Sequence, residues 1–206
     1  MMKNYLLIAT LITSFQLFSQ EAYFLTGNNF TKYIFKTSGE SMTTKLQVGT
    51  GSTYEIGYSI PLKYPKVSYA ISLTLDDYNA IAGSSVSSYS WDSKYVGVQN
   101  GISYNYPIST NFQLLVNGGL NFSTIIYGKQ TINGAVNDLK TQDEFSGMLL
   151  LSFIRLQTRY KLNDYGYLSL GYGFSKSLNP FNLSPQKLSF NTNQILFGIH
   201  FNINKK

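Results

Sequence analysis

The stretch 46-LQVGTGSTYEIGYSI-60 decides the fold class of this chain. From residue 54 onward every second side chain is large and apolar, and Glu55, Gly57 and Ser59 lie between them. Successive side chains of a β-strand point to opposite faces, so the alternation predicts a strand with one apolar face and one face of polar groups and glycine. Helical spacing does not produce that split.

The same alternation recurs along the chain. It predicts seven strands, at residues 46–60, 67–75, 96–106, 112–126, 154–160, 168–174 and 195–203. An eighth strand is expected at residues 23–36, where its phase stays open because Phe30 and Ile34 compete with Tyr33 and Phe35 for the apolar face. The connections alternate between short turns (61–66, 107–109, 162–166) and long polar segments (77–94, 128–146, 176–189). Short turns at one end and longer loops at the other are typical of outer-membrane barrels, with the short turns periplasmic.

Residues 1–20 have the pattern of a cleaved signal peptide. Lys3 gives a positive start, an apolar run of about 11 residues follows, and Ser19 is a small residue suited to a cleavage site. A spanning helix needs roughly 20 apolar residues, so a membrane anchor is the weaker interpretation. We expect two segments, a signal peptide at 1–20 and a barrel domain at 21–206.

Composition favours a membrane barrel over a soluble β-protein. Only 13% of the residues are charged and 16% are aromatic. A soluble sandwich or lipocalin-like barrel would turn its apolar face inward and meet water with the other face, which here carries few charges. We therefore predict an all-β fold, an antiparallel up-and-down transmembrane barrel of about eight strands. The net charge of +6 comes from scattered lysines that form no basic stripe, so nucleic-acid binding is not expected.

Aromatic residues gather on the predicted apolar face beside the short turns. An aromatic belt at that depth is expected where a barrel wall meets the membrane interface. The predicted periplasmic girdle consists of Tyr58, Tyr69, Tyr104, Tyr106, Phe112, Tyr160 and Phe201.

A few charged residues fall on the predicted lumen face. Arg155 and Arg159 are the only arginines, and Glu55 is the one acidic residue deep within a predicted strand. An inward charge in a narrow barrel needs a partner. We predict that Glu55 pairs with Arg155 or Arg159 across the lumen, where the charges fill and rigidify the barrel; a proton or ion path is the alternative.

Two short motifs resemble a known family. Gly27-Asn28-Asn29-Phe30-Thr31 and Gly119-Leu120-Asn121-Phe122-Ser123 share a Gly-x-Asn-Phe-Ser/Thr pattern, and the chain ends ILFGIHFNINKK. Together they resemble the small outer-membrane β-barrel proteins of Bacteroidota, the PorT-like family. The resemblance implies a small eight-stranded barrel, and some members resemble accessories of protein secretion.

Enzymatic and transport functions have little support in the sequence. His200 would need a nearby serine and acid to form a hydrolase of the kind that trims lipid in barrels, and the chain has no Gly-x-Ser-x-Gly motif. With one histidine and no cysteine, we expect no metal site and no cofactor. Trp91, in a predicted loop, is expected either to contact a partner or to lie against lipid headgroups.

The expected function is that of a non-enzymatic structural or interaction component of the bacterial outer membrane. The alternatives are an accessory of outer-membrane protein secretion or assembly, and a narrow channel. Eight strands leave an interior that side chains can fill, which disfavours transport of large solutes. The expected partners are outer-membrane lipid, the barrel-assembly machinery, and other envelope proteins bound through the long loops.

Overall fold

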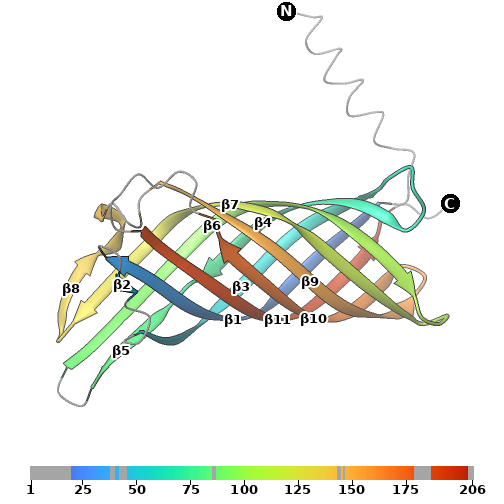
Figure 1. Ribbon diagram of the computed structural model, residues 1–206. Coiled ribbons are helices and arrows are strands. Elements are labelled where there is room, and N and C mark those ends of the chain that lie inside the picture. Colours follow the sequence, from blue (N-terminus) through green and yellow to red (C-terminus); the bar gives the residue numbers. More distant parts are fainter. Residues whose placement is uncertain are drawn as a thin grey trace, which may run out of the picture.

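A computed structural model describes residues 20–37, 40–41, 46–84, 87–142, 145, 147–178 and 187–203, and in it the chain forms a closed antiparallel barrel (Figure 1). Each barrel strand pairs with the next along the chain, and β1 closes the barrel by pairing with both β3 and β11. The eight strands are β1 (Glu21–Thr37), β3 (Leu46–Pro61), β4 (Val67–Asp77), β6 (Ser87–Pro107), β7 (Phe112–Ile132), β9 (Met148–Asn163), β10 (Gly166–Ser177) and β11 (Lys187–Asn202). The fold class predicted from the alternation is confirmed.

The apolar face of the strands forms the outside of the barrel. On β3, Ile56 is 62% exposed, whereas its neighbour Glu55 is 3% exposed and faces the lumen. The same contrast runs along the other strands, for example between Leu73 and Ser72 on β4. This orientation is opposite to that of a soluble sandwich or lipocalin-like barrel, because large apolar side chains cover the wall and polar ones fill the interior.

The first strand resolves the phase that the sequence left open. Odd-numbered residues from Tyr23 to Tyr33 face the lumen, and Phe24 and Lys32 are exposed on the wall. The pattern was ambiguous because Leu25 and Tyr33 are buried in a lumen that is otherwise mostly polar.

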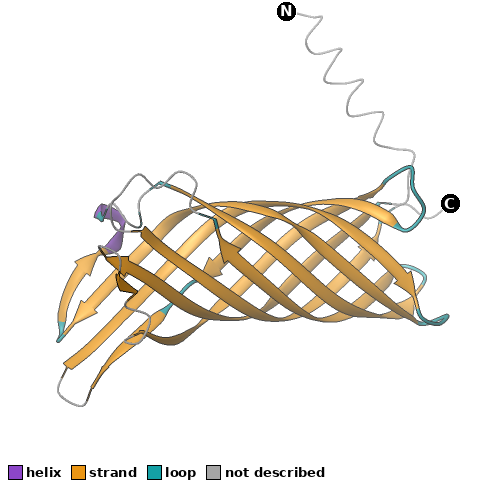
Figure 2. Ribbon diagram, viewed as in Figure 1, coloured by secondary structure: helices purple, strands orange, loops and turns teal. Residues whose placement is uncertain are grey.

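The two ends of the barrel differ in shape, as Figure 2 shows. The three short turns lie together at one end, where β1 begins and β11 ends. At the other end, β6 and β7 extend beyond the rest of the barrel and carry short added strands (Figure 1). These are β2 (Glu40–Ser41) on β1, β5 (Ala80–Ser84) on β3 and β6, and β8 (Ala135–Asp138) on β7, followed by the 3-10 turn η2 (Leu139–Thr141).

The prediction that residues 77–94 and 128–146 are long loops is therefore wrong over much of their length. In β6, Trp91 and Tyr95 point inward while Asp92 is exposed, so the alternation continues with its sign inverted. Beyond the apolar wall the barrel has the pattern of a soluble β-protein, apolar inside and polar outside. The β7–β8 hairpin turns at Asn133 and Gly134, whose φ values of 48° and 87° suit the two-residue turn type with positive φ at both positions.

The leader predicted at residues 1–20 lies outside the described residues, apart from Gln20. Within the described part of the chain, no helix is long and apolar enough to cross a membrane.

Candidate functional site

The lumen is the most elaborate part of the molecule, and it has three levels. A polar cavity lies beside the short turns, a network of buried charges and amides occupies the middle, and an aromatic cluster fills the end that carries β5 and β8. The arrangement follows from the strand pattern, because every second residue of all eight barrel strands is directed inward.

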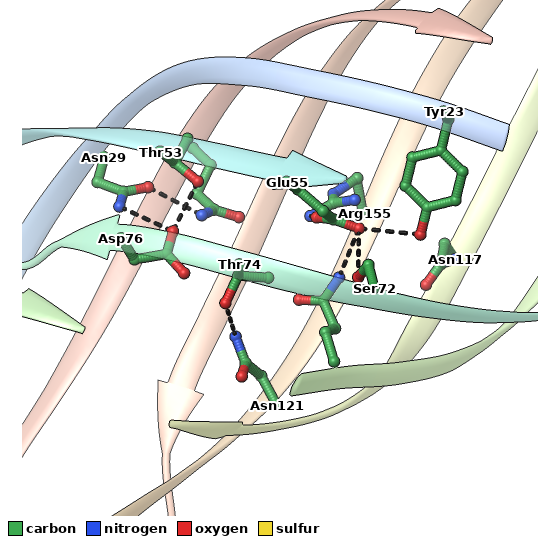
Figure 3. Close-up of polar contacts among 12 residues, drawn as sticks. Tyr23, Asn29, Thr53, Glu55, Ser72, Thr74, Asp76, Asn117, Asn121 and Arg155 are labelled. Carbon is green, nitrogen blue, oxygen red and sulfur yellow. Dashed lines mark hydrogen bonds and ion pairs between the residues drawn. The ribbon is translucent and has the colours of Figure 1, made fainter. Parts of the chain in front are cut away.

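Glu55 is the hub of the middle level (Figure 3). Arg155 Nη2 lies 2.7 Å from Glu55 Oε2, and both side chains are buried. Glu55 Oε1 accepts hydrogen bonds from Tyr23 at 3.0 Å, Ser72 at 2.8 Å and Gln99 at 3.1 Å. One carboxylate therefore ties together β1, β3, β4, β6 and β9, with hydrogen bonds to both of its oxygens.

Arg159, the other predicted partner of Glu55, lies against Glu21 instead. Glu21 also accepts from or donates to His200, with 2.8 Å between Oε1 and Nδ1. The sequence gave no signal for Glu21 as a lumen residue, because it directly follows the predicted leader and precedes the predicted first strand.

Asp76 is a second buried acid that sequence reasoning missed. It accepts hydrogen bonds from Thr53 at 2.6 Å and from Asn29 at 3.3 Å, and Asn29 in turn accepts from Gln194 at 2.8 Å. The interpretation of Glu55 as the one acid within a strand is therefore corrected: β4 runs to Asp77, two residues past its predicted end. Strand length was the missing information, since Asp76 has the inward parity of Ser72.

Ser169, His200 and Glu21 form a hydrogen-bonded chain with the order of a serine hydrolase triad. Ser169 Oγ lies 2.9 Å from His200 Nε2, and His200 Nδ1 lies 2.8 Å from Glu21. The serine, however, is only 2% exposed and does not line the neighbouring cavity. A Cβ added at Gly198 would meet its hydroxyl at 2.4 Å and Leu25 at 2.3 Å, so these groups enclose the serine.

That enclosure bears on chemistry. Acyl transfer needs room for a carbonyl carbon about 3 Å from the nucleophile and for donors to the developing oxyanion. The space around Ser169 is filled by protein. The arrangement therefore fits a hydrogen-bonding role for His200 better than catalysis.

Trp91 lies in the aromatic cluster at the far end of the lumen. It is 5% exposed and packs edge-on against Tyr33 and Phe145, with ring centroids 5.1 and 5.2 Å apart. Both expectations for Trp91, a partner contact from a loop and a headgroup contact, are wrong, because residue 91 belongs to β6 and faces inward. The buried members of the cluster are Tyr33, Tyr78, Ala80, Trp91, Tyr95, Leu139, Phe145, Leu151 and Phe190.

The predicted girdle residues occupy one depth on the outer wall. Each lies within a few residues of a short turn or of the adjoining strand end, on the outward face. Phe112 and Tyr160 are direct cross-strand neighbours with ring centroids 5.0 Å apart, and the Lys66 amine lies 5.8 Å from the Tyr106 ring. The remaining members are Tyr58, Tyr69, Tyr104 and Phe201.

No cluster of three or more histidines and acidic residues suited to a metal ion is found among the described residues. The described lumen residues likewise include no phosphate-cradling loop, since they all lie on strands or at strand ends.

Comparison with known proteins identifies the fold alone. No family model and no curated protein matches the chain. Among solved structures, Neisserial surface protein A matches 88% of this chain and 99% of its own, with a TM-score of 0.52 and 10% identity. The outer membrane protease OmpT from Escherichia coli matches 90% of this chain and 97% of its own, with a TM-score of 0.51 and 7% identity.

The chain thus shares its fold with bacterial outer-membrane barrels. One of the two neighbours is a protease and the other is named only as a surface protein, so the shared fold does not decide between an enzyme and a non-enzyme.

Proposed function

We propose that this protein is a non-enzymatic structural or interaction barrel of the bacterial outer membrane, exported by a cleaved signal peptide. The observation that carries the proposal is the filled lumen. The Glu55–Arg155 pair closes its middle, and the aromatic cluster around Trp91 closes the end beyond it. A barrel filled in this way offers a rigid wall and rigid ends rather than a path.

The outer wall supports placement in a lipid bilayer. Its exposed side chains include Ile56, Leu73, Ile154 and Leu170, each more than half exposed. A contiguous apolar surface of this extent is rare on soluble monomers, and a barrel can satisfy all backbone hydrogen bonds within a membrane. The girdle then places the short turns at one interface, which we assign to the periplasm, and insertion requires the barrel-assembly machinery.

The end that carries β8 supports an interaction role. Leu139 and Phe145 anchor the segment after β8 in the aromatic cluster, so the β7–β8 hairpin is held against the barrel. Val136 on β8 is 60% exposed, and Ile81 on β5 is also exposed. Apolar side chains presented on a rigid scaffold outside the membrane band are suited to contacts with another envelope protein.

Site-specific crosslinking in native membranes tests this role. A photoreactive residue at Val136 is expected to give a discrete adduct with a partner protein. The matched control is the same residue at Tyr64, which is 73% exposed but lies in a short turn at the opposite end. No adduct from Val136, or the same adducts from both positions, would contradict the proposed interaction surface.

The runner-up function is an accessory of outer-membrane protein secretion or assembly. It rests on the resemblance of Gly27–Thr31 and Gly119–Ser123 to the PorT-like family. A secretion component captured from Val136 would select this function, whereas an unrelated partner would favour a stand-alone interaction barrel.

A narrow channel is the remaining alternative. Planar-bilayer recordings are expected to show no steady conductance for the purified barrel, because buried side chains occupy the described lumen at two levels. Steady conductance that is lost on changing Arg155 would establish the channel instead.

A further inference from the structure

The cavity beside the short turns has features of a ligand site, and it lies at the end opposite the proposed interaction surface. Its volume is about 230 Å³. Its lining includes Pro61, Gln113 and Asn202 at strand ends, and Arg155 and Gln157 deeper in the lumen. The cavity therefore extends from the short-turn end of the barrel toward the Glu55–Arg155 pair.

One strand lines this cavity with a row of unused hydrogen-bond donors. Arg155, Gln157 and Arg159 alternate along β9, face inward and are each at most 4% exposed. Arg155 Nε, Gln157 Nε2 and Arg159 Nε have no hydrogen-bond partner in the protein. A buried donor without a partner is destabilising, so a ligand that accepts from this row would satisfy an existing deficit.

Acceptors with the same deficit lie on the neighbouring strands. Asn105 and Asn117, on β6 and β7, also line the cavity, and their Oδ1 atoms are unpartnered. Their amide groups are already engaged: Asn105 donates to Gln113 at 2.9 Å, and Asn117 donates to Ser103 at 2.6 Å. The cavity thus needs a ligand that both accepts and donates.

Charge restricts the class of ligand further. Arg155 is paired with Glu55, and Arg159 is paired with Glu21. With His200 neutral, these four groups sum to zero charge. An anionic ligand would leave one uncompensated charge inside the barrel, which is strongly unfavourable, whereas an uncharged ligand would not.

Size completes the description of the ligand. The volume is equivalent to roughly seven or eight water molecules at about 30 Å³ each and is below the range of about 300–1,000 Å³ usual for drug-sized ligands. A hydroxyl group both donates and accepts, so a compact polyhydroxylated molecule matches the mixed lining.

We propose that this cavity binds one uncharged saccharide unit, which enters from the short-turn end. Its hydroxyl oxygens accept from Arg155, Gln157 and Arg159, and its hydroxyl protons are donated to Asn105 and Asn117. The proposed function at the opposite end does not depend on this site.

Nuclear magnetic resonance titration tests the proposal on the whole barrel in a zwitterionic, sugar-free detergent, with D-glucose as the probe. The expected result is a saturable shift of the Gln157 side-chain amide and of the two arginine Nε–H signals. Gln157→Leu should weaken binding at least tenfold, while Gln47→Leu, at an exposed position on β3 near the other end, should leave it unchanged.

Because Gln157→Leu lies deep in the barrel and could impair folding, Asn105→Leu nearer the mouth is the second variant and should also weaken binding. No saturable shift with D-glucose would mean that the cavity holds water only. Saturation by sodium sulfate without saturation by glucose would overturn the uncharged class, and unaltered binding in both cavity variants would overturn the site.

Discussion

Arg155 on β9 donates to Glu55 on β3 from the opposite side of the barrel, with 2.7 Å between Nη2 and Oε2. In the cyclic strand order each lies four strands from the other, so the pair spans the lumen at its full width. Tyr23, Ser72 and Gln99 converge on the same carboxylate. This contact therefore braces the barrel across its interior.

Removing one partner of this pair should destabilise the barrel. Glu55→Ala leaves Arg155 as an uncompensated buried charge, which costs about 3–5 kcal/mol in free energy of unfolding. For a domain of this size that corresponds to a fall in Tm of roughly 10 °C. Thermal unfolding followed by circular dichroism in detergent measures the change.

Two further variants separate the pair from a general effect of substitution. Glu55→Ala combined with Arg155→Ala should be less destabilising than the sum of the two single changes, because no lone charge remains. Asp92→Ala, at an exposed position on β6, should change the free energy of unfolding by no more than about 0.5 kcal/mol. An unchanged Tm for Glu55→Ala would disprove the bracing role.

Trp91 offers a direct optical measurement of the aromatic cluster, because it is the only tryptophan in the chain. Its burial against Tyr33 and Phe145 predicts a blue-shifted emission and weak quenching by iodide in the folded barrel. Unfolding in guanidinium should shift the emission to the red and restore quenching. Strong quenching of the folded protein would place Trp91 at the surface and contradict the closed end.

Ser169 should be unreactive toward fluorophosphonates, despite its hydrogen bond to His200. The enclosed hydroxyl has no room for the phosphorus centre, so labelling is expected to equal that of Ser169→Ala. His200→Ala should instead lower the Tm, because Glu21 and Ser169 each lose a buried partner. Covalent labelling that disappears in Ser169→Ala would establish a hydrolase.

The alternation of side chains predicted the barrel, its strand order and the inward direction of Glu55, Arg155 and Arg159. It could not predict which inward residues meet, because parity determines the face of a strand but not the height at which opposite strands meet. That height depends on the register around the whole barrel. Glu21 was missed for this reason, and its pairing with Arg159 required the structure.

The end that carries Trp91 was mispredicted for a different physical reason. Inside the membrane band apolar side chains face outward, and beyond it they face inward. A strand that crosses this boundary keeps its period of two but inverts its polarity. Residues 87–95 therefore read as a polar loop, although they continue β6.

The lipid-facing wall is the central claim, and spin-label accessibility at Ile56 tests it most directly. The chain has no cysteine, so Ile56→Cys and the control Tyr64→Cys each carry one label in a reconstituted bilayer. Ile56 lies on the outward face of β3, about 17 Å along the strand from Pro61 at roughly 3.4 Å per residue, near the middle of an apolar band of about 25 Å. The account predicts that the Ile56 label collides with dissolved oxygen and not with a water-soluble nickel chelate, and that the Tyr64 label shows the reverse preference. Equal access of the nickel chelate to both labels would contradict a membrane barrel.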